Sequence, residues 1–276
     1  MTIAIGLLAS DGLVLAADGQ ITAGDDKLSM GKWHCQSLAN PGGAGPGSSV
    51  VLCAGTHPVY MREAMSTVQG VFRDELDDVD DPLRHKLSDA LTDFFVDRIN
   101  PFAEHGENRP QVELIVGYDR PGARQVLHSQ LGLFGNDVYG AIGIGAPHAL
   151  RLLQNLWRFP GPDIFGTAML AAYVMHYAKA ASIYCGKHTD MFLVRGGRIQ
   201  ILRRQQTQRL EQLMEEYQRH LEPAAFRNAI EQPLTTEQSH AGFIAAAQIR
   251  QAIADLRATW DATYPTSPTS SSSDQT

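Results

Sequence analysis

The chain begins Met1-Thr2, and the hydroxyl of Thr2 is the first group in the sequence that could act as a nucleophile. Methionine is usually removed when the next residue is small, and its removal would leave Thr2 with both a hydroxyl and a free α-amine. The unperturbed pKa of an α-amine is about 7.7–8.0, so at neutral pH enough of it is neutral to accept the hydroxyl proton. Threonine activated by its own amine is an established arrangement for nucleophilic catalysis. We therefore take Thr2 as a candidate nucleophile and base.

A carboxylate follows at the end of the first apolar segment. The first 18 residues are predicted to form two strands, Ile3–Ala9 and Leu13–Ala17, because an Asp-Gly turn with its need for positive φ separates two apolar runs. A two-residue turn would pair position 5 with 18 and position 2 with 21. That pairing puts Asp18 about 10 Å along the strand from Thr2, which is too far for a direct hydrogen bond.

Lys32 lies a short loop downstream and could bridge this gap. An ammonium group held between Asp18 and the hydroxyl of Thr2 would favour the alkoxide by its charge. A shift of the strand register by one residue would turn Asp18 to the opposite face. Taken alone, Asp18 is more simply a turn residue at a strand end, and Lys32 a solvated loop charge. Their order and spacing make them candidates for one site.

Strands and helices follow one another in blocks along the rest of the chain. The predicted order is strands, two helices, strands, two helices and strands, which favours an α+β layered architecture over alternating parallel βαβ units. Apolar residues at helical spacing mark the helices. The further predicted strands are Ser49–Ala54, 112–118, 124–130, 189–194 and 198–202, and the predicted helices are 61–76, 83–99, Pro147–Trp157 and Ile164–Ala181.

A change of composition near residue 202 predicts a separate segment. From about Leu202 to Trp260 the chain is rich in Gln, Arg, Glu, Ala and Leu, with one amphipathic helix and a second helix over Thr236–Trp260. The last residues are rich in Ser and Pro and cannot offset the entropy of ordering, so they are predicted to be disordered. We divide the chain into a core domain at 1–202, a helical extension at 203–263 and a disordered tail at 264–276.

The composition argues against several classes of partner and cofactor. The 276 residues include 23 basic and 30 acidic ones, giving a formal net charge of −7, and no basic block with interleaved aromatics, so no nucleic-acid partner is expected. No run approaches the ~20 apolar residues that span a bilayer, and we expect a cytoplasmic protein with no membrane partner. Cys35, Cys53 and Cys185 are far apart and lack CxxC spacing, so we expect no disulfide framework, no metal and no cofactor.

The opening segment from Thr2 to Gly24, in which DGLVLAAD overlaps DGQITAG, resembles that of proteasome β-type subunits, and the bacterial HslV peptidase and its relatives are the closest match. Shorter resemblances at VVLCAGTHPVY, AIGIGAPHA and ASIYCGKHTDMFLV extend the likeness to about Leu202. The resemblance implies an Ntn-hydrolase fold, a four-layer αββα sandwich with two sheets between outer helices. It also implies N-terminal-threonine hydrolysis of peptides and unfolded proteins inside two stacked homo-oligomeric rings of 12 or 14 subunits.

The resemblance also assigns roles to single residues. Thr2 becomes the nucleophile and base, Asp18 the partner of the catalytic lysine, and the amide of Gly55 the donor to the oxyanion. An amide aimed at a developing oxyanion is typically worth about 2.7–4 kcal/mol. Thr22 would align the substrate backbone as an added strand.

The resemblance also places Cys53 and His57 near the pocket for the side chain that precedes the cleaved bond. The lysine position has two candidates, because an ungapped alignment puts His34 there, whereas Lys32 fits if the preceding loop is shortened by about two residues. We favour Lys32, since a neutral histidine would lack the constant charge that this arrangement requires.

Two positions depart from the family pattern. Ile144 stands where the family usually has a serine, and Ala180 where it often has an aspartate, and both groups normally hold the terminal amine. Because positioning accounts for several kcal/mol of barrier lowering, their absence predicts weak or absent catalysis. Two alternatives to an active peptidase follow: a ring-forming structural subunit without catalysis, and an Ntn amidase that acts on a small molecule.

The sequence contains no GxxxxGK[ST] loop for binding phosphates, so we do not expect the chain to unfold substrates with ATP. A threonine-type endopeptidase of this kind would need a separate AAA+ ATPase or an adaptor to process folded proteins. Without such a partner, its substrates would be restricted to peptides and unfolded chains.

Overall fold

The computed structural model describes residues 3–23, 26–29, 32–38, 47–74, 82–104, 109–130, 133–157, 161–229 and 236–265. Thr2, the candidate nucleophile, lies outside the described residues. Within them the chain forms antiparallel sheets together with helices, which confirms the predicted α+β class. None of the helices in these ranges combines the length and the apolar character that a bilayer crossing requires.

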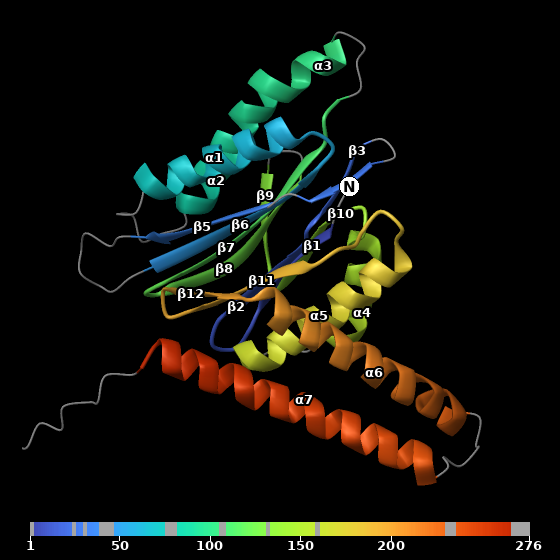
Figure 1. Cartoon of the computed structure of the whole chain (residues 1–276). Coiled ribbons are helices and arrows are strands. Elements are labelled where there is room, and N and C mark those ends of the chain that lie inside the picture. Colours follow the sequence, from blue (N-terminus) through green and yellow to red (C-terminus); the bar gives the residue numbers. More distant parts are fainter. Residues whose placement is uncertain are drawn as a thin grey trace, which may run out of the picture.

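The first sheet, here called the N-terminal sheet, brings together strands from both ends of the chain. Its strand order is β10-β1-β2-β11-β12, with every neighbouring pair antiparallel (Figure 1). The strands are β1 Ile3–Leu8, β2 Leu13–Asp18, β10 Tyr139–Gly143, β11 Thr189–Arg195 and β12 Arg198–Leu202. The central strand β2 is buried along its whole length, as its unbroken apolar sequence indicates.

The second sheet has the strand order β5-β6-β7-β8-β9 and is also antiparallel throughout. Its strands are β5 Trp33–Leu38, β6 Gly47–Gly55, β7 Val112–Arg120, β8 Ala123–Gln130 and β9 Leu133–Asp137. A separate two-stranded ribbon, β3 Gln20–Ala23 with β4 Asp26–Ser29, leads from β2 toward β5.

Helices pack on the outer faces of both sheets (Figure 1). The second sheet is covered by α1 Pro58–Asp74 and α2 Pro82–Phe94, which continues through a short π-helix, η1 Phe95–Ile99, into α3 Asn100–Glu104. The N-terminal sheet is covered by α4 Ala146–Leu156 and α5 Ile164–Ala181. Between the two sheets lies a third cluster of buried side chains that includes Leu15, Leu52, Ile115, Val126 and Phe192. Burial of these apolar surfaces fixes how the sheets stack and so where their edges meet.

The C-terminal helices α6 Arg204–Ala229 and α7 Thr236–Thr263 form an antiparallel pair that packs on α5 (Figure 1). Leu213, Met214, Leu256 and Trp260 join the same hydrophobic cluster as the buried face of α5. The sheet ends at Leu202, directly before α6, in agreement with the change of composition there. The division into a core domain and an extension stays a prediction, and residues 266–276 lie outside the described part of the chain.

The register of the first hairpin differs from the predicted one by two residues. Leu8 pairs with Leu13 and Ala4 with Ala17, so the loop holds four residues instead of two, and the amide of Ala9 donates to the carbonyl of Gly12 at 2.9 Å. A shift by two keeps each side chain on the same face of the strand. Its effect is to move Asp18 along the sheet to a place beside the first residues of β1, so the predicted 10 Å offset was wrong.

Candidate active site

Asp18 and Lys32 form a fully buried ion pair near the start of β1. The Nζ of Lys32 lies 3.0 Å from Oδ1 of Asp18, and the two side chains are 1% and 0% exposed. The same Oδ1 accepts the amide of Ile3 at 3.0 Å, while Oδ2 accepts the amide of Gly186 at 3.0 Å. A carboxylate that accepts hydrogen bonds from an ammonium and two amides is held in one orientation. Since Thr2 is bonded to Ile3, the pair lies within one residue of the candidate nucleophile.

The backbone explains why these two side chains meet. Asp18 is the last residue of β2 and pairs with Thr189 of β11 on one side, while its carboxylate reaches the amide of Ile3 on the other. Lys32 immediately precedes β5, where its carbonyl accepts the amide of Cys53 from β6 at 2.9 Å. The lysine therefore extends from the second sheet to a carboxylate on the N-terminal sheet.

Burial and the carboxylate act on Lys32 in opposite directions. Burial lowers the pKa of Lys32 below its ordinary value because the ammonium group loses its hydration, and the charge and hydrogen bond of Asp18 oppose this shift. The charged state of Lys32 therefore depends on Asp18.

His34, the alternative for the lysine position, lies exposed on β5. Partial loss of hydration of its ring, together with the charge of Arg73, lowers the pKa of His34 and so favours its neutral form. The structure brings Lys32, and not His34, to Asp18.

Side chains at the start of β11 support both members of the pair. Asp190 accepts the indole N–H of Trp33, the residue after Lys32, at 3.0 Å and lies 3.5 Å from the imidazole Nε2 of His188. The carbonyl of His188 accepts the amide of Gly19, the residue after Asp18, at 2.8 Å. The chain is thus fixed on both sides of the ion pair.

A second group of contacts connects this region to helix α6. The Nζ of Lys179, on α5, lies 2.6 Å from Oε1 of Glu211 on α6, 3.0 Å from the hydroxyl of Thr189 and 3.3 Å from the carbonyl of Lys187. Thr189 also donates to Glu211. These contacts hold the loop between α5 and β11, which supplies the Gly186 amide to Asp18. Neither Lys179 nor Glu211 was among the residues predicted from the sequence, because the contact joins segments 32 residues apart.

The amide of Gly55 points toward the side of β6 on which Lys32 lies. Successive amides of a strand point to opposite sides. The amide of Cys53 donates to Lys32 and the amide of Thr56 donates to the carbonyl of Gln111, so the amide of Gly55 faces the same way as that of Cys53. A Cβ at position 55 would lie 2.3 Å from the carbonyl oxygen of Gln111, so the close approach of β7 alone already requires glycine here.

A cavity of about 320 Å³ opens beside Gly55 and is also lined by Thr56, Gln111, Glu113 and Ile144. Ile144, which stands where the family usually has a serine, lines this cavity. Ala180, in contrast, is exposed near the end of α5.

The predicted substrate-binding residues lie in different surroundings. Cys53 is completely buried in the hydrophobic cluster beneath α1, and burial raises the pKa of its thiol far above the ordinary value. Its thiol lines neither of the two described cavities, so in this conformation it cannot contact a substrate side chain directly. His57 is exposed, with its ring 5.1 Å from that of Tyr60. Thr22 lies in β3 opposite Lys27.

Near the start of β1 the structure adds Cys185, which the sequence analysis treated only as a buried thiol. A Cβ on Gly145 would lie 2.9 Å from both the sulfur of Cys185 and the Cβ of Ile3, so these three residues are in close contact. Burial raises the pKa of Cys185, which keeps the thiol neutral. The cysteines that can be described are free, and no cluster of metal-ligating side chains occurs in the described ranges.

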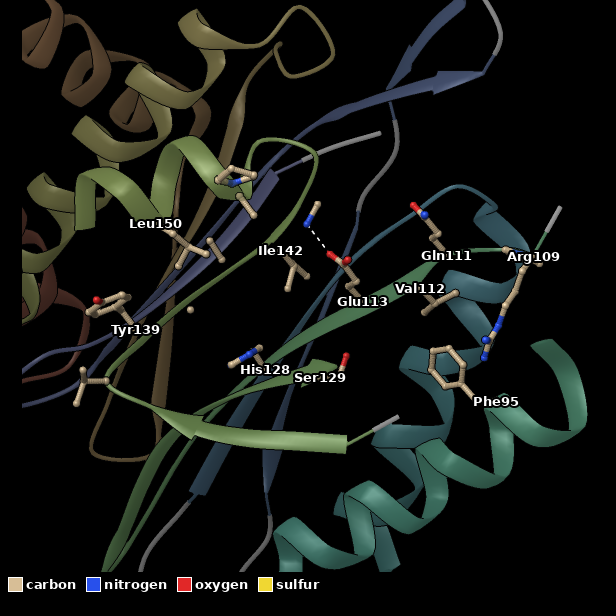
Figure 2. Close-up of a pocket in the computed structure, with 17 residues that line it drawn as sticks. Phe95, Arg109, Gln111, Val112, Glu113, His128, Ser129, Tyr139, Ile142 and Leu150 are labelled. Carbon is tan, nitrogen blue, oxygen red and sulfur yellow. Dashed lines mark hydrogen bonds between the residues drawn. The ribbon is translucent and has the colours of Figure 1, made fainter. Parts of the chain in front are cut away.

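A larger cleft of about 900 Å³ adjoins the Gly55 cavity at the edge of the N-terminal sheet (Figure 2). The two share Gln111, Glu113 and Gly143 in their walls. The Glu113 carboxylate accepts the amide of Gly143 at 2.6 Å, which connects β7 to the end of β10.

No protein-family model matches this chain, and no curated protein matches its sequence. Solved structures do match its fold. The Anbu (Gly-1) mutant from Hyphomicrobium sp. strain MC1 has a TM-score of 0.65 and 16% identity, with 85% of this chain and 99% of that chain covered. Anbu (ancestral beta-subunit) from Yersinia bercovieri has a TM-score of 0.61 and 16% identity, covering 85% and 100%. The helical assembly of the Anbu complex from Pseudomonas aeruginosa has a TM-score of 0.64 and 16% identity, with 82% of this chain and 96% of that chain covered.

The chain has the Anbu fold. The assignment to the HslV peptidase and its relatives was therefore wrong, because these structural neighbours are Anbu chains. Coverage of 85% exceeds what residues 1–202 of a 276-residue chain can supply, so the likeness extends into the segment after Leu202. The short motifs before Leu202 carry no information on this segment.

Proposed function

We propose that this chain is a proteasome-like threonine-type peptidase subunit that cleaves peptides and unfolded polypeptides. The observation that carries the proposal is the buried pair of Asp18 and Lys32 beside Ile3. Removing two charges from water costs several kcal/mol, and such pairs are uncommon unless a specific arrangement depends on them. The Anbu fold of the chain agrees with this assignment.

In the proposed mechanism, removal of Met1 frees the α-amine of Thr2. The Thr2 oxygen attacks the carbonyl carbon of the peptide bond, and its proton passes to the α-amine while Lys32 stabilises the developing negative charge on that oxygen. The amide of Gly55 donates to the carbonyl oxygen as it becomes an oxyanion. The carbon–nitrogen bond then breaks, the leaving nitrogen takes the proton from the α-amine, and water hydrolyses the resulting ester.

We further propose that the chain works as a homo-oligomer with the four-layer αββα arrangement of Ntn hydrolases. A helical assembly is named for the Anbu complex from Pseudomonas aeruginosa, and the packing of helices on the outer faces of both sheets supports the layered arrangement. In finer detail, we propose two stacked rings of 12 or 14 subunits and a separate AAA+ ATPase as partner. Native mass spectrometry tests the number of subunits, and a pull-down in the presence of ATP tests the partner.

A structural subunit without catalysis is the second candidate, and Ile144 is the observation that favours it. Its apolar side chain lines the cavity beside Gly55, where the family usually offers a serine to the terminal amine. Intact-mass measurement separates the two candidates, because a retained Met1 would block the amine. A small-molecule amidase, the third candidate, would turn over small amides and leave peptides intact.

Cleavage of a fluorogenic peptide by the Thr2→Ala variant tests the proposal. We expect the rate to fall by at least about 10³-fold, since the variant keeps the terminal amine but loses the attacking oxygen. Thr67→Ala is the matched control, because the Thr67 hydroxyl donates to the Glu63 carbonyl within the described part of α1, away from the candidate site. A Thr2→Ala variant that cleaves as fast as the unmodified protein would rule the mechanism out.

A further inference from the structure

The large cleft continues directly from the candidate active site. The cavity beside Gly55 and the cleft of about 900 Å³ share Gln111, Glu113 and Gly143, so a chain whose carbonyl lies at the Gly55 amide can extend from one into the other. Glu113 lines both cavities, and Figure 2 shows it in the cleft together with Ile142 and His128. The combined volume is much larger than the transfer of one acyl group requires.

One wall of the cleft is the outer edge of a strand. β10 is the last strand of the N-terminal sheet, and all its residues, Tyr139–Gly143, line the cleft. The amide of Leu8 donates to the carbonyl of Val138, so Val138 and every second residue after it face β1. The backbone groups of Tyr139 and Ala141 therefore face the cleft, as does the amide of Gly143, which donates to Glu113. An outer edge of this kind is a template for an added strand.

The remaining walls provide both apolar and polar contacts. Phe95 and Val112 line one side and Leu150 of α4 lines the other, with His128 and Ser129 between them (Figure 2). Apolar walls around an exposed strand edge are suited to a polypeptide whose alternate side chains point away from the added strand.

We propose that this cleft binds the part of a polypeptide that follows the cleaved bond, as an extended strand paired with Tyr139 and Ala141. The inference rests on the proposed function and adds the substrate class: an extended polypeptide with several residues beyond the cut. A small amide would leave most of the cleft empty.

Glu113 suits the chemistry at the junction of the two cavities. Cleavage breaks the carbon–nitrogen bond, and the fragment that leaves begins with a new amine, which takes up a proton at neutral pH. The Glu113 carboxylate, 2.6 Å from the Gly143 amide, lies in the wall where this ammonium would form. The leaving fragment is thus held by its charge as well as by its backbone.

The first test is binding and cleavage of matched peptides by the Ala141→Pro variant. Proline removes the outward N–H, and an edge position with its N–H facing outward tolerates it. For the unmodified protein, a peptide with four residues after the cut should have a kcat/KM at least about tenfold above that of one with a single residue. Ala141→Pro should reduce this ratio to about one and weaken binding of the long peptide, measured by fluorescence polarisation, by about tenfold.

The matched control is Ile201→Pro on β12, the opposite edge of the same sheet. The carbonyl of Ile199 accepts the hydroxyl of Tyr264, so Ile199 and Ile201 face outward there, and this variant should keep both the ratio and the binding. Should Ala141→Pro fail to fold, the same test is made on the unmodified protein with a peptide N-methylated after the cut, which should lose about tenfold in affinity.

A second ligand pair tests Glu113. A free-amine fragment should compete with the labelled peptide several-fold better than its N-acetylated form, and Glu113→Gln should remove that difference. Binding that depends on Ala141 without any cleavage would refute the proposed function and keep the cleft assignment. Cleavage by the unmodified protein with equal kcat/KM for the long and the short peptide would overturn the cleft assignment and keep the proposed function. If the protein binds no peptide and Ala141→Pro instead reduces its oligomer mass, the cleft is an interface between copies and the inference is wrong.

Discussion

At the scale of single residues, the ion pair of Asp18 and Lys32 is the basis of the proposed active site. Both side chains are buried, and the pair is not isolated, because the amides of Ile3 and Gly186 donate to the same carboxylate. The attraction between buried charges offsets their loss of hydration only when such further hydrogen bonds are present. The pair is therefore a weak source of stability and a strong constraint on geometry, which is what the proposed role of Lys32 requires.

Removal of one partner should be far more costly than removal of both. Lys32→Met leaves Asp18 as an uncompensated buried charge, so we expect a loss of about 3–5 kcal/mol in the free energy of unfolding. The double variant Asp18→Asn with Lys32→Met should lose clearly less, because no net charge remains buried. Urea denaturation of the unmodified protein, the two single variants Asp18→Asn and Lys32→Met, and the double variant gives the coupling free energy between the two side chains. Strictly additive losses in the free energy of unfolding would show that the two side chains act independently.

Activity should follow Lys32 and not His34. We expect Lys32→Met to reduce peptide cleavage by at least about 10²-fold, and His34→Gln, at an exposed position, to leave it within about twofold. If His34→Gln instead abolished cleavage in the same fluorogenic assay and Lys32→Met did not, His34 would be the residue at the lysine position, as in the ungapped alignment.

The pH dependence of stability provides a separate test of the buried lysine. Burial lowers the pKa of Lys32 in the folded chain, whereas its ordinary value is 10.5. Between the two values the unfolded chain binds more protons, so the contribution of Lys32 to the free energy of unfolding rises with pH up to about 10.5. The raised pKa values of Cys53 and Cys185 act in the opposite sense, and Lys32→Met retains both thiols. The free energy of unfolding of the unmodified protein, minus that of Lys32→Met, should therefore increase as the pH rises toward about 10.5. A difference that does not change with pH would contradict this account.

Residue types and spacing suggested Asp18 and Lys32, which the structure brings together, whereas Gly55 was assigned by the family resemblance alone. They were insufficient for Gly186 and Glu211, whose roles depend on contacts across 168 and 32 residues. The burial of Cys53 beneath α1 could not be predicted from its position in the sequence, because it depends on how the helix packs on the sheet.

At the scale of elements, the start of β11 and helix α6 hold the site together. The Lys179–Glu211 pair fixes the loop that supplies the Gly186 amide, and Thr189 pairs with Asp18 in the sheet. The helical extension is thus in contact with the elements that position the proposed catalytic pair.

We expect Glu211→Gln to reduce kcat for peptide cleavage by about tenfold with little change in KM, because it loosens the loop behind Asp18 without touching the substrate. Glu215→Gln is the matched control, since Glu215 lies one turn further along α6 in an exposed pair with Arg219. Equal kcat values for Glu211→Gln and Glu215→Gln would show that the extension does not position the site.

The first hairpin shows why local sequence predicted the strands but not their register. Asp11-Gly12 suggests a two-residue turn, yet the side chain of Asp11 accepts the amide of Ile164 at the start of α5, at 2.7 Å, and pairs with Arg195. A Cβ on Gly12 would lie 2.6 Å from the carbonyl oxygen of Val194. The loop is shaped by tertiary contacts with α5 and β11, which override the turn preference.

The strands that sequence patterns missed have a similar explanation. β5 Trp33–Leu38 contains His, Cys, Gln and Ser, and only its last residue is buried, so it shows neither an apolar run nor a clear alternation. Pairing with β6 stabilises it instead. The long apolar strands β6 and β7 were found because both lie in the interior of the second sheet.

At the scale of the whole molecule, the fold combines the stacked sheets with a long helical pair that leaves apolar side chains exposed. Phe243 and Ile244 on α7 are 70% and 46% exposed. In the proposed homo-oligomer we expect native mass spectrometry to give a multiple of 30.2 kDa. Phe243→Asp should reduce the assembled mass, because burying an aspartate at a contact is unfavourable.

Val96→Asp is the control for this experiment, since Val96 is 53% exposed in η1, on the helices that cover the second sheet. It should leave the mass unchanged. A monomer in both the unmodified protein and Val96→Asp would refute the proposed assembly.

The central claim is most directly tested by the mass of the intact protein after reaction with a threonine-directed electrophile, with the adduct located by tandem mass spectrometry. The account predicts that Met1 is absent, that one adduct forms on Thr2, and that Lys32→Met slows its formation by at least about 10²-fold. A chain that retains Met1, or that carries no adduct on Thr2 under conditions that modify an authentic threonine peptidase, would contradict it.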